Sequence, residues 1–185
     1  MYIGDLLQSG GIVGDIWKKG AKIASSDIRQ ASSILILGLG AGTAAKVFSQ
    51  KWPKAKIIGV EIDKEVIRLG KKYFDLGQIP NLKTINKDAF EYVTCCMTHD
   101  ACHFDLIIVD LYLGEKIPVK SESLTFLKNL KKLLSKNGIV IFNRLFWGKH
   151  KKEAKLFVQK TEKIFKEVKL VRTVANLLVI CKERI

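Results

Sequence analysis

Three acidic residues follow a glycine-rich loop, each at a point where an apolar run gives way to a helix-compatible segment. The loop is 38–43 and the acids are Glu61, Asp88 and Asp110. Glycines let a ligand approach the backbone closely and expose the amides at a helix start. Glu61 comes nineteen residues after Gly42, a spacing at which a carboxylate can accept both hydroxyls of a ribose. Each acid alone would also suit a helix N-cap, but the three together favour a nucleoside site.

Short apolar runs alternate with helix-compatible segments along most of the chain. The expected strands are 34–37, 56–61, 82–86, 104–110 and 139–142, followed by a closing hairpin of 168–171 and 176–181. Such alternation is typical of an α/β protein whose sheet is covered by helices on both faces. We therefore expect a Rossmann-like, seven-stranded, mostly parallel sheet with an antiparallel edge strand. In such sheets ligands bind at the carboxyl ends of the strands, where the acids stand.

The first thirty residues do not join this alternation and are rich in glycine, at positions 4, 10, 11, 14 and 20. The sequence therefore predicts a short N-terminal arm or lid over 1–30 and one catalytic domain over 31–185. A chain of 185 residues, 48% apolar and 27% charged, suits a single globular domain and excludes a disordered protein.

The chain is strongly basic, with 32 Lys and Arg against 18 Asp and Glu and a net charge of +14. Such a balance favours acidic partners, nucleic acid above all. Only five of the basic residues are Arg, the residue that makes forked phosphate and base contacts, and the lysines are spread over several expected helices. Solvated helix faces are therefore the favoured interpretation, and RNA binding is kept as an alternative.

Three of the four cysteines lie close together with histidines in the segment 95–103. Cys96, His99 and Cys102 are three residues apart, which suits metal ligation, but no second Cys-x-x-Cys pair completes a zinc finger. Reduced thiols without metal are the favoured interpretation. No apolar run approaches the roughly 20 residues of a membrane span, and the N-terminus lacks a charged signal-peptide start, so we expect a cytoplasmic protein that binds no membrane.

Taken together, the segments 34–43, 60–63, 88–89 and 104–110 resemble the spermidine synthase family. That family belongs to the class I S-adenosylmethionine-dependent methyltransferase fold. The resemblance covers essentially 33–181 and is most specific at Val-Glu-Ile-Asp over 60–63. The segment 4–9 is also similar to the family segment whose glutamine reaches the cofactor.

The resemblance implies a pocket for S-adenosylmethionine or its decarboxylated form, without a metal. Glu61 would hold the ribose, Asp88 would meet the adenine, and Gln8 would close over the cofactor. Asp110 matches the family's catalytic aspartate, which accepts a proton from the attacking amine. Tyr112, in the next loop, is expected either to line the acceptor pocket or simply to pack. The residues implied to bind the cofactor are Gln8, Gly38, Gly40, Gly42, Glu61, Ile62, Asp88 and Ala89.

Two departures from the family pattern bear on the reaction. Aminopropyltransferases carry an aspartate in the glycine loop and another three residues after the catalytic one, and these positions are Ala41 and Leu113 here. A basic protein without these carboxylates would bind cationic polyamines poorly. We therefore favour methyl transfer to a small-molecule acceptor, with aminopropyl transfer as the alternative and RNA methylation as a further one. A homodimer is possible.

Overall fold

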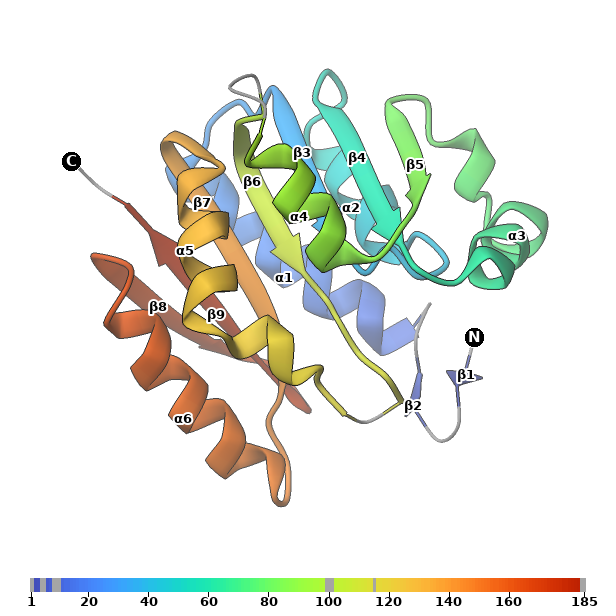
Figure 1. Cartoon of the computed structure of the whole chain (residues 1–185). Helices are drawn as coiled ribbons and strands as arrows, with labels where there is room; N and C mark the ends of the chain where they lie inside the picture. Colours follow the sequence, from blue (N-terminus) through green and yellow to red (C-terminus); the bar gives the residue numbers. More distant parts are fainter. Residues whose placement is uncertain (1, 4–5, 8–10, 99–101, 115, 184–185) are drawn as a thin grey trace.

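A seven-stranded sheet forms the centre of the computed structural model, which describes residues 2–3, 6–7, 11–98, 102–114 and 116–183 (Figure 1). Its strands pair in parallel from the β5 edge to β7, whereas β9 runs antiparallel to both β7 and β8. The predicted mixed sheet with an antiparallel edge strand is confirmed. In spatial order the strands are β5 (Leu82–Asn86), β4 (Lys56–Glu61), β3 (Ser33–Leu37), β6 (Phe104–Val109), β7 (Leu134–Leu145), β9 (Asn176–Lys182) and β8 (Glu167–Arg172).

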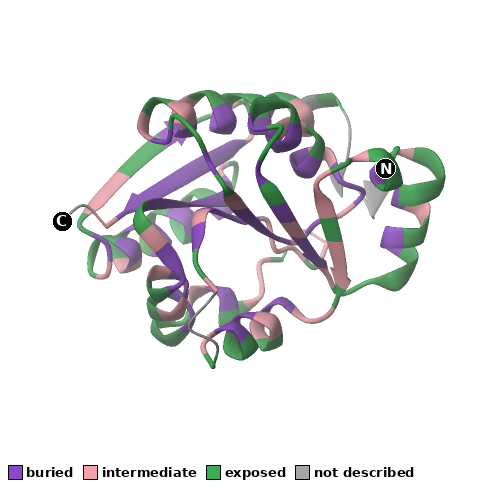
Figure 2. Cartoon of the chain, turned by 90° about the horizontal axis from the view of Figure 1, so that it is seen from above, coloured by how far each residue is buried: buried purple, intermediate pink, exposed green. Residues whose placement is uncertain are grey.

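Helices cover both faces of this sheet, and Figure 2 shows its buried strands lying between them. One face carries α1 (Gly11–Asp27), α2 (Thr43–Lys51) and α3 (Lys64–Tyr73), and the other α4 (Ala89–Cys96), α5 (Leu124–Lys132) and α6 (His150–Glu162). Short 3₁₀ helices, η1 (Leu76–Gln78) and η2 (Val119–Glu122), and a two-stranded ribbon of β1 (Tyr2–Ile3) and β2 (Leu6–Leu7) complete the elements. None of the helices in the described part of the chain has the length and apolarity that a membrane span needs.

Helix α1 differs from the arm expected over 1–30. Its Trp17 is fully buried and packs against Phe48 of α2, with ring centroids 5.9 Å apart. The glycines in this segment suggested a lid or arm, but Gly20 is buried, and a Cβ there would make an ordinary contact with Leu178 Cδ1 of β9 at 3.4 Å. For residues 11–27 the expectation of an arm is therefore wrong, because apolar residues at helical spacing bury this helix on the sheet.

The strand order reverses between β3 and β6, since β3 is followed along the chain by β4 on one side and β6 lies on its other side. Loops after these two strands diverge to opposite sides and leave a crevice at the carboxyl end of the sheet. The loops after β3, β4, β5 and β6 all open towards that crevice. This topology therefore determines where a ligand can enter.

Candidate functional site

The loop between β3 and α2 can form only with glycines at key positions. Gly38 has a φ of +87°, and a Cβ on it would lie 2.2 Å from the carbonyl oxygen of Asp110. Gly42 has a φ of +96°, and a Cβ there would lie 2.4 Å from Leu76 Cδ1. Side chains other than hydrogen are thus excluded by both conformation and space. The loop is held directly against the end of β6, where Asp110 stands.

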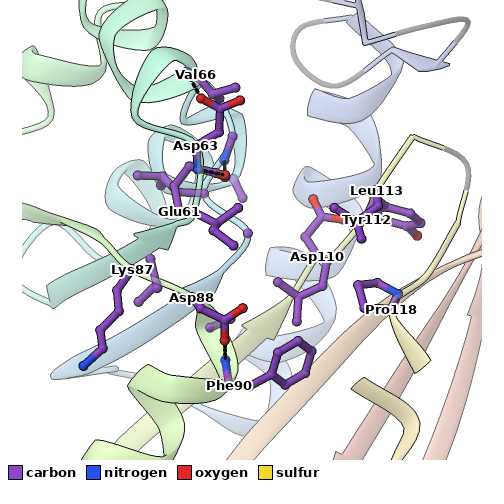
Figure 3. Close-up of a pocket in the computed structure, with 18 of the residues that line it drawn as sticks. Glu61, Asp63, Val66, Lys87, Asp88, Phe90, Asp110, Tyr112, Leu113 and Pro118 are labelled. Carbon is purple, nitrogen blue, oxygen red and sulfur yellow. Dashed lines mark hydrogen bonds between the residues drawn. The ribbon is translucent and has the colours of Figure 1, made fainter. Parts of the chain in front are cut away.

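Glu61, the last residue of β4, ties this loop to the neighbouring one. Its Oε2 accepts a hydrogen bond from the Gly40 amide at 2.8 Å, and its Oε1 accepts one from the Asp63 amide at 3.0 Å. A carboxylate has about four lone-pair sites, so both oxygens keep capacity for a second donor. Glu61 is half-buried and borders the cavity (Figure 3). The arrangement suits a ligand with two adjacent hydroxyl groups.

Asp63 and Asp88 are both helix N-caps, each through its Oδ1. Asp63 accepts from the amides of Glu65 and Val66 at 2.8 and 3.3 Å, which begins α3. Asp88 accepts from the amides of Phe90 and Glu91 at 2.8 and 3.0 Å, which begins α4. Asp88 also borders the cavity. The capping role and the ligand role suggested for Asp88 are therefore compatible, because capping engages one of its two oxygens.

Asp110 follows β6 directly and lies across the cavity from Glu61 (Figure 3). Its amide donates to the carbonyl oxygen of Leu37 at 2.8 Å, and its Oδ1 accepts from Asn143 Nδ2 at 2.9 Å. Burial raises the pKa of this carboxyl group to about 6, and the charge of Glu61 acts in the same direction. The Asn143 hydrogen bond and the nearby indole N–H of Trp17 oppose this rise. Asp110 is thus poised to exchange a proton near neutral pH.

Tyr112 lies beyond Asp110 and borders the same cavity, as expected. Its hydroxyl donates to the carbonyl oxygen of Asn143 at 2.8 Å, so this side chain also has the packing role considered as the alternative. Burial raises its pKa well above 10, which keeps it a hydrogen-bond donor. Leu113, the next residue, is 64% exposed at the mouth of the cavity.

One cavity of about 430 Å³ brings most of the expected site residues together. This volume lies within the usual range for small-molecule sites. Gly42 shapes the turn but does not border the cavity, and Gln8 lies outside the described residues. The expected residues that border it are Gly38, Gly40, Glu61, Ile62, Asp88, Ala89, Asp110 and Tyr112.

Several residues contribute to this cavity without having been expected from the sequence. Val13 and Trp17 border it from α1, Lys87 from the loop after β5, and Lys120 from η2. The helical spacing of apolar residues in 16–28 was a signal that could have placed α1 on the sheet. Asn143 carried a weaker signal, as a polar residue directly after the apolar run 139–142.

The cysteine segment shows no metal site in the part of it that the structure describes. Among the described residues, no three His, Cys, Asp or Glu side chains come together as metal ligands. Cys96 is buried, and burial raises the pKa of its thiol to about 11, which disfavours the thiolate that a metal needs. His99 lies outside the described residues, so the metal-free state of the 95–103 segment stays a prediction.

Comparison with known proteins agrees with this geometry. A "probable polyamine aminopropyl transferase" of Bifidobacterium longum is 34% identical over 113 residues, which is 61% of this chain and 24% of that protein. An "eEF1A lysine and N-terminal methyltransferase homolog" of Drosophila melanogaster is 29% identical over 116 residues, 60% of this chain and 17% of that protein. This chain therefore spans less than a quarter of the length of both curated relatives.

Among solved structures, human methyltransferase-like protein 13 in complex with SAH superposes with a TM-score of 0.76 at 18% identity. The match covers 94% of this chain and 80% of that one, and it shows the shared methyltransferase-like fold. The profile of the spermine/spermidine synthase domain matches residues 21–179, which include every strand of the sheet except the last three residues of β9. The chain belongs to the spermine/spermidine synthase domain family.

Proposed function

We propose that this protein is an S-adenosylmethionine-dependent transferase that moves a methyl group to an amine. The observation that carries this proposal is the pair of carboxylates across one cavity, Glu61 on the nucleoside side and Asp110 on the other. Family membership supports the general class of transferase. The choice between methyl and aminopropyl transfer depends on the residues around Asp110.

The residues of the cavity fit a nucleoside with a sulfonium side chain. The Glu61 carboxylate would accept the ribose hydroxyls, and Asp88 with the buried Ala89 would meet the adenine. At Gly38 and Gly40 the loop presents bare backbone to the cavity, so the sulfonium part could pass close to it. Gln8 stays an expected contact of the cofactor. Bound S-adenosylmethionine would supply an electrophilic methyl group on a positively charged sulfur.

Asp110 would act on the acceptor side of the reaction. In its ionised form it attracts a cationic amine and orients it, and it can accept the proton that the nitrogen must lose. With a pKa of about 6 the carboxyl group is largely ionised at neutral pH, yet it is basic enough to take a proton transiently. The fully buried Trp17 also borders the cavity and places an apolar ring system near Asp110. Asp110 and Trp17 can each be tested by substitution.

The part of the cavity around Asp110 and Leu113, where the acceptor would bind, favours an amine with one positive charge over a diamine. Leu113 stands where aminopropyltransferases carry a second carboxylate, and it is 64% exposed; Pro118 and Lys120 also border the cavity. Ala41, where those enzymes carry the loop aspartate, is buried and does not border the cavity. A diamine would thus meet one acidic residue and a lysine at this end. The relative named as a lysine and N-terminal methyltransferase adds protein amines to the small molecules expected as acceptors.

Aminopropyl transfer is the second candidate, because the family profile and the B. longum relative both point to it. It would use decarboxylated S-adenosylmethionine as donor and the same Asp110 as base. The cytoplasmic location, the homodimer and the RNA-binding alternative stay predictions.

Donor preference separates the two reactions. Calorimetric titration with S-adenosylmethionine and with its decarboxylated form should show tighter binding of the carboxylated donor. Stronger binding of the decarboxylated donor, with aminopropyl transfer to a diamine in a product assay, would overturn the methyl-transfer proposal. The acceptor can then be sought by following S-adenosylhomocysteine release across a panel of small amines and lysine-containing peptides.

A further inference from the structure

Two buried asparagines lie on adjacent strands behind Asp110. Asn143 of β7 is 7% exposed, and Asn176 of β9 is 8% exposed. The register pairs them with Leu178 and Leu145, two positions apart across the antiparallel ladder. A buried amide costs free energy unless its donors and acceptors are hydrogen-bonded. The partners of these two amides therefore indicate why they are there.

The hydrogen bonds of the two amides run in one direction, towards Asp110. Asn176 Nδ2 donates to Asn143 Oδ1 at 2.9 Å, and Asn143 Nδ2 donates to Asp110 Oδ1 at 2.9 Å. An ionised carboxylate can only accept hydrogen bonds, so the amide nitrogen of Asn143 must face it. The oxygen of Asn143 then needs a donor, which Asn176 supplies. The orientation of each amide is thus set by the next.

Hydrogen bonds also hold the main chain of both asparagines in place. The amide of Thr173 donates to the carbonyl oxygen of Asn176 at 2.8 Å, and the amide of Asn176 donates to Thr173 Oγ1 at 3.2 Å. At the other end the Tyr112 hydroxyl donates to the carbonyl oxygen of Asn143 at 2.8 Å. The β8–β9 turn and the loop after β6 therefore hold the pair on opposite sides.

We propose that Asn143 and Asn176, here called the amide pair, are positioning residues that hold Asp110 ionised and direct its second oxygen, Oδ2, towards the acceptor. The acceptor part of this inference rests on the proposed function, whereas the effect on Asp110 does not. An ionised Asp110 attracts an ammonium group and can take a proton, and a protonated Asp110 can do neither. The amide pair thereby favours cationic amines as acceptors.

Other charged groups near Asp110 do not replace this effect. Burial and the Glu61 charge both favour the protonated form, whereas Asn143 and the Trp17 indole favour the ionised form. Arg144, the neighbour of Asn143, is engaged elsewhere, in an ion pair with Glu122 and over the ring of Phe157 at 4.3 Å. The other titratable groups that border the cavity are Asp63, Lys87, Asp88, Tyr112 and Lys120.

The pKa of Asp110 in the ligand-free protein tests this inference directly. It can be followed by NMR titration of carboxyl carbons in protein labelled at aspartate, with Asp110→Asn identifying the signal. Asn143→Leu keeps the side chain close to its volume and removes the donor, so the pKa should rise by about one unit or more. Asn176→Leu should raise it by less, because Asn143 remains but loses its orienting partner. Asn81→Ala, which removes an amide bonded to Ala55 far from Asp110, should leave it unchanged.

An Asp110 pKa in Asn143→Leu within about 0.3 units of that of the unaltered protein would overturn the inference, since a merely structural amide would lower stability without moving the titration. Should Asn143→Leu not fold, Asn143→Thr, which suits a strand and is too short to reach Asp110, is judged by the same measurement and the same limit. Neither result depends on cofactor or acceptor. Failure of the proposed function would appear separately, as a lack of nucleoside binding by the unaltered protein.

Discussion

Replacement of Glu61 tests the nucleoside site most directly, because its carboxylate has two separable roles in the structure. It ties the glycine loop to the start of α3 through the amides of Gly40 and Asp63, and it would accept the ribose hydroxyls. Glu61→Ala removes both roles. Glu61→Gln keeps the shape but replaces one oxygen with an amide group that cannot accept from the backbone.

The expected loss of affinity follows from the hydrogen bonds involved. A hydrogen bond to a charged group contributes about 1.5–3 kcal/mol, and Glu61 is only half-buried, so water can replace part of it. We expect Glu61→Ala to weaken nucleoside binding by about 1–3 kcal/mol, or roughly 5- to 150-fold. Stability should also fall, by about 1–2 kcal/mol, since two amides lose a charged acceptor.

Calorimetric titration with S-adenosylhomocysteine and methylthioadenosine is the assay. Both compounds contain the same ribose, so Glu61→Ala should weaken their binding by similar factors. The matched control is Glu65→Ala, four residues along the chain, where the carboxylate is exposed and pairs with Arg68 Nε at 2.7 Å. Affinities of folded Glu61→Ala within threefold of those of the unaltered protein would refute the assignment of Glu61 to the ribose.

Three further changes test other parts of the site. Asp110→Asn should stabilise the fold above pH 6, because the pKa of this acid rises from an ordinary value of 3.8 to about 6 on folding, which makes its ionisation costly, by about 3 kcal/mol at most. This gain in stability should disappear as the pH falls from 6 towards 4. Urea denaturation at pH 8 and pH 4.5 measures it, and a variant that is no more stable than the unaltered protein at pH 8 would contradict the expectation. Turnover of Asp110→Asn should drop more than tenfold. Leu113→Asp, at a 64% exposed position, should tighten diamine binding without changing nucleoside affinity, as measured by calorimetry, and an unchanged diamine affinity would count against the acceptor assignment. Gly42→Ala should destabilise the protein by about 2 kcal/mol or more, because φ is +96° and the new Cβ would lie 2.4 Å from Leu76 Cδ1. Its control is Gly114→Ala, where φ is +59° and, among the described residues other than the chain neighbours, no atom would lie within 4 Å of the new Cβ. Thermal melts in which the two variants lose equal stability would contradict the steric argument.

The sheet was predictable because central strands such as β3 and β6 are almost wholly apolar and alternate with helix-compatible segments of ordinary length. The order of 34–37, 56–61 and 104–110 in the chain was enough to place Glu61 and Asp110 at one edge. Residues 11–27 were not placed correctly, because glycine content outweighed helical spacing in the interpretation. Gly20 is buried near Leu178, which is 158 residues further along the chain, and local sequence does not reveal this neighbour.

The polar surroundings of Asp110 were also beyond the sequence. The bond from Asn143 to Asp110 depends on the β6–β7 register, which shifts between Phe104 and Leu106. An irregular register moves every later residue relative to its neighbour and leaves no local signature. Glu61 was expected to bind the ligand, which stays a prediction, whereas its hydrogen bond to Gly40 was not expected, since that bond depends on how the glycine loop turns.

Leu113 and Lys116 exchange two backbone hydrogen bonds: the Leu113 amide donates to the Lys116 carbonyl oxygen at 2.8 Å, and the Lys116 amide donates to the Leu113 carbonyl oxygen at 3.1 Å. The end of β4 that carries Glu61, by contrast, is hydrogen-bonded to two other loops, through the amides of Gly40 after β3 and Lys87 after β5. The residues around Leu113 can therefore change with little effect on folding, whereas those around Glu61 cannot. Among related proteins the acceptor would then vary more than the bound nucleoside. Family membership would therefore predict the donor of a given member better than its acceptor.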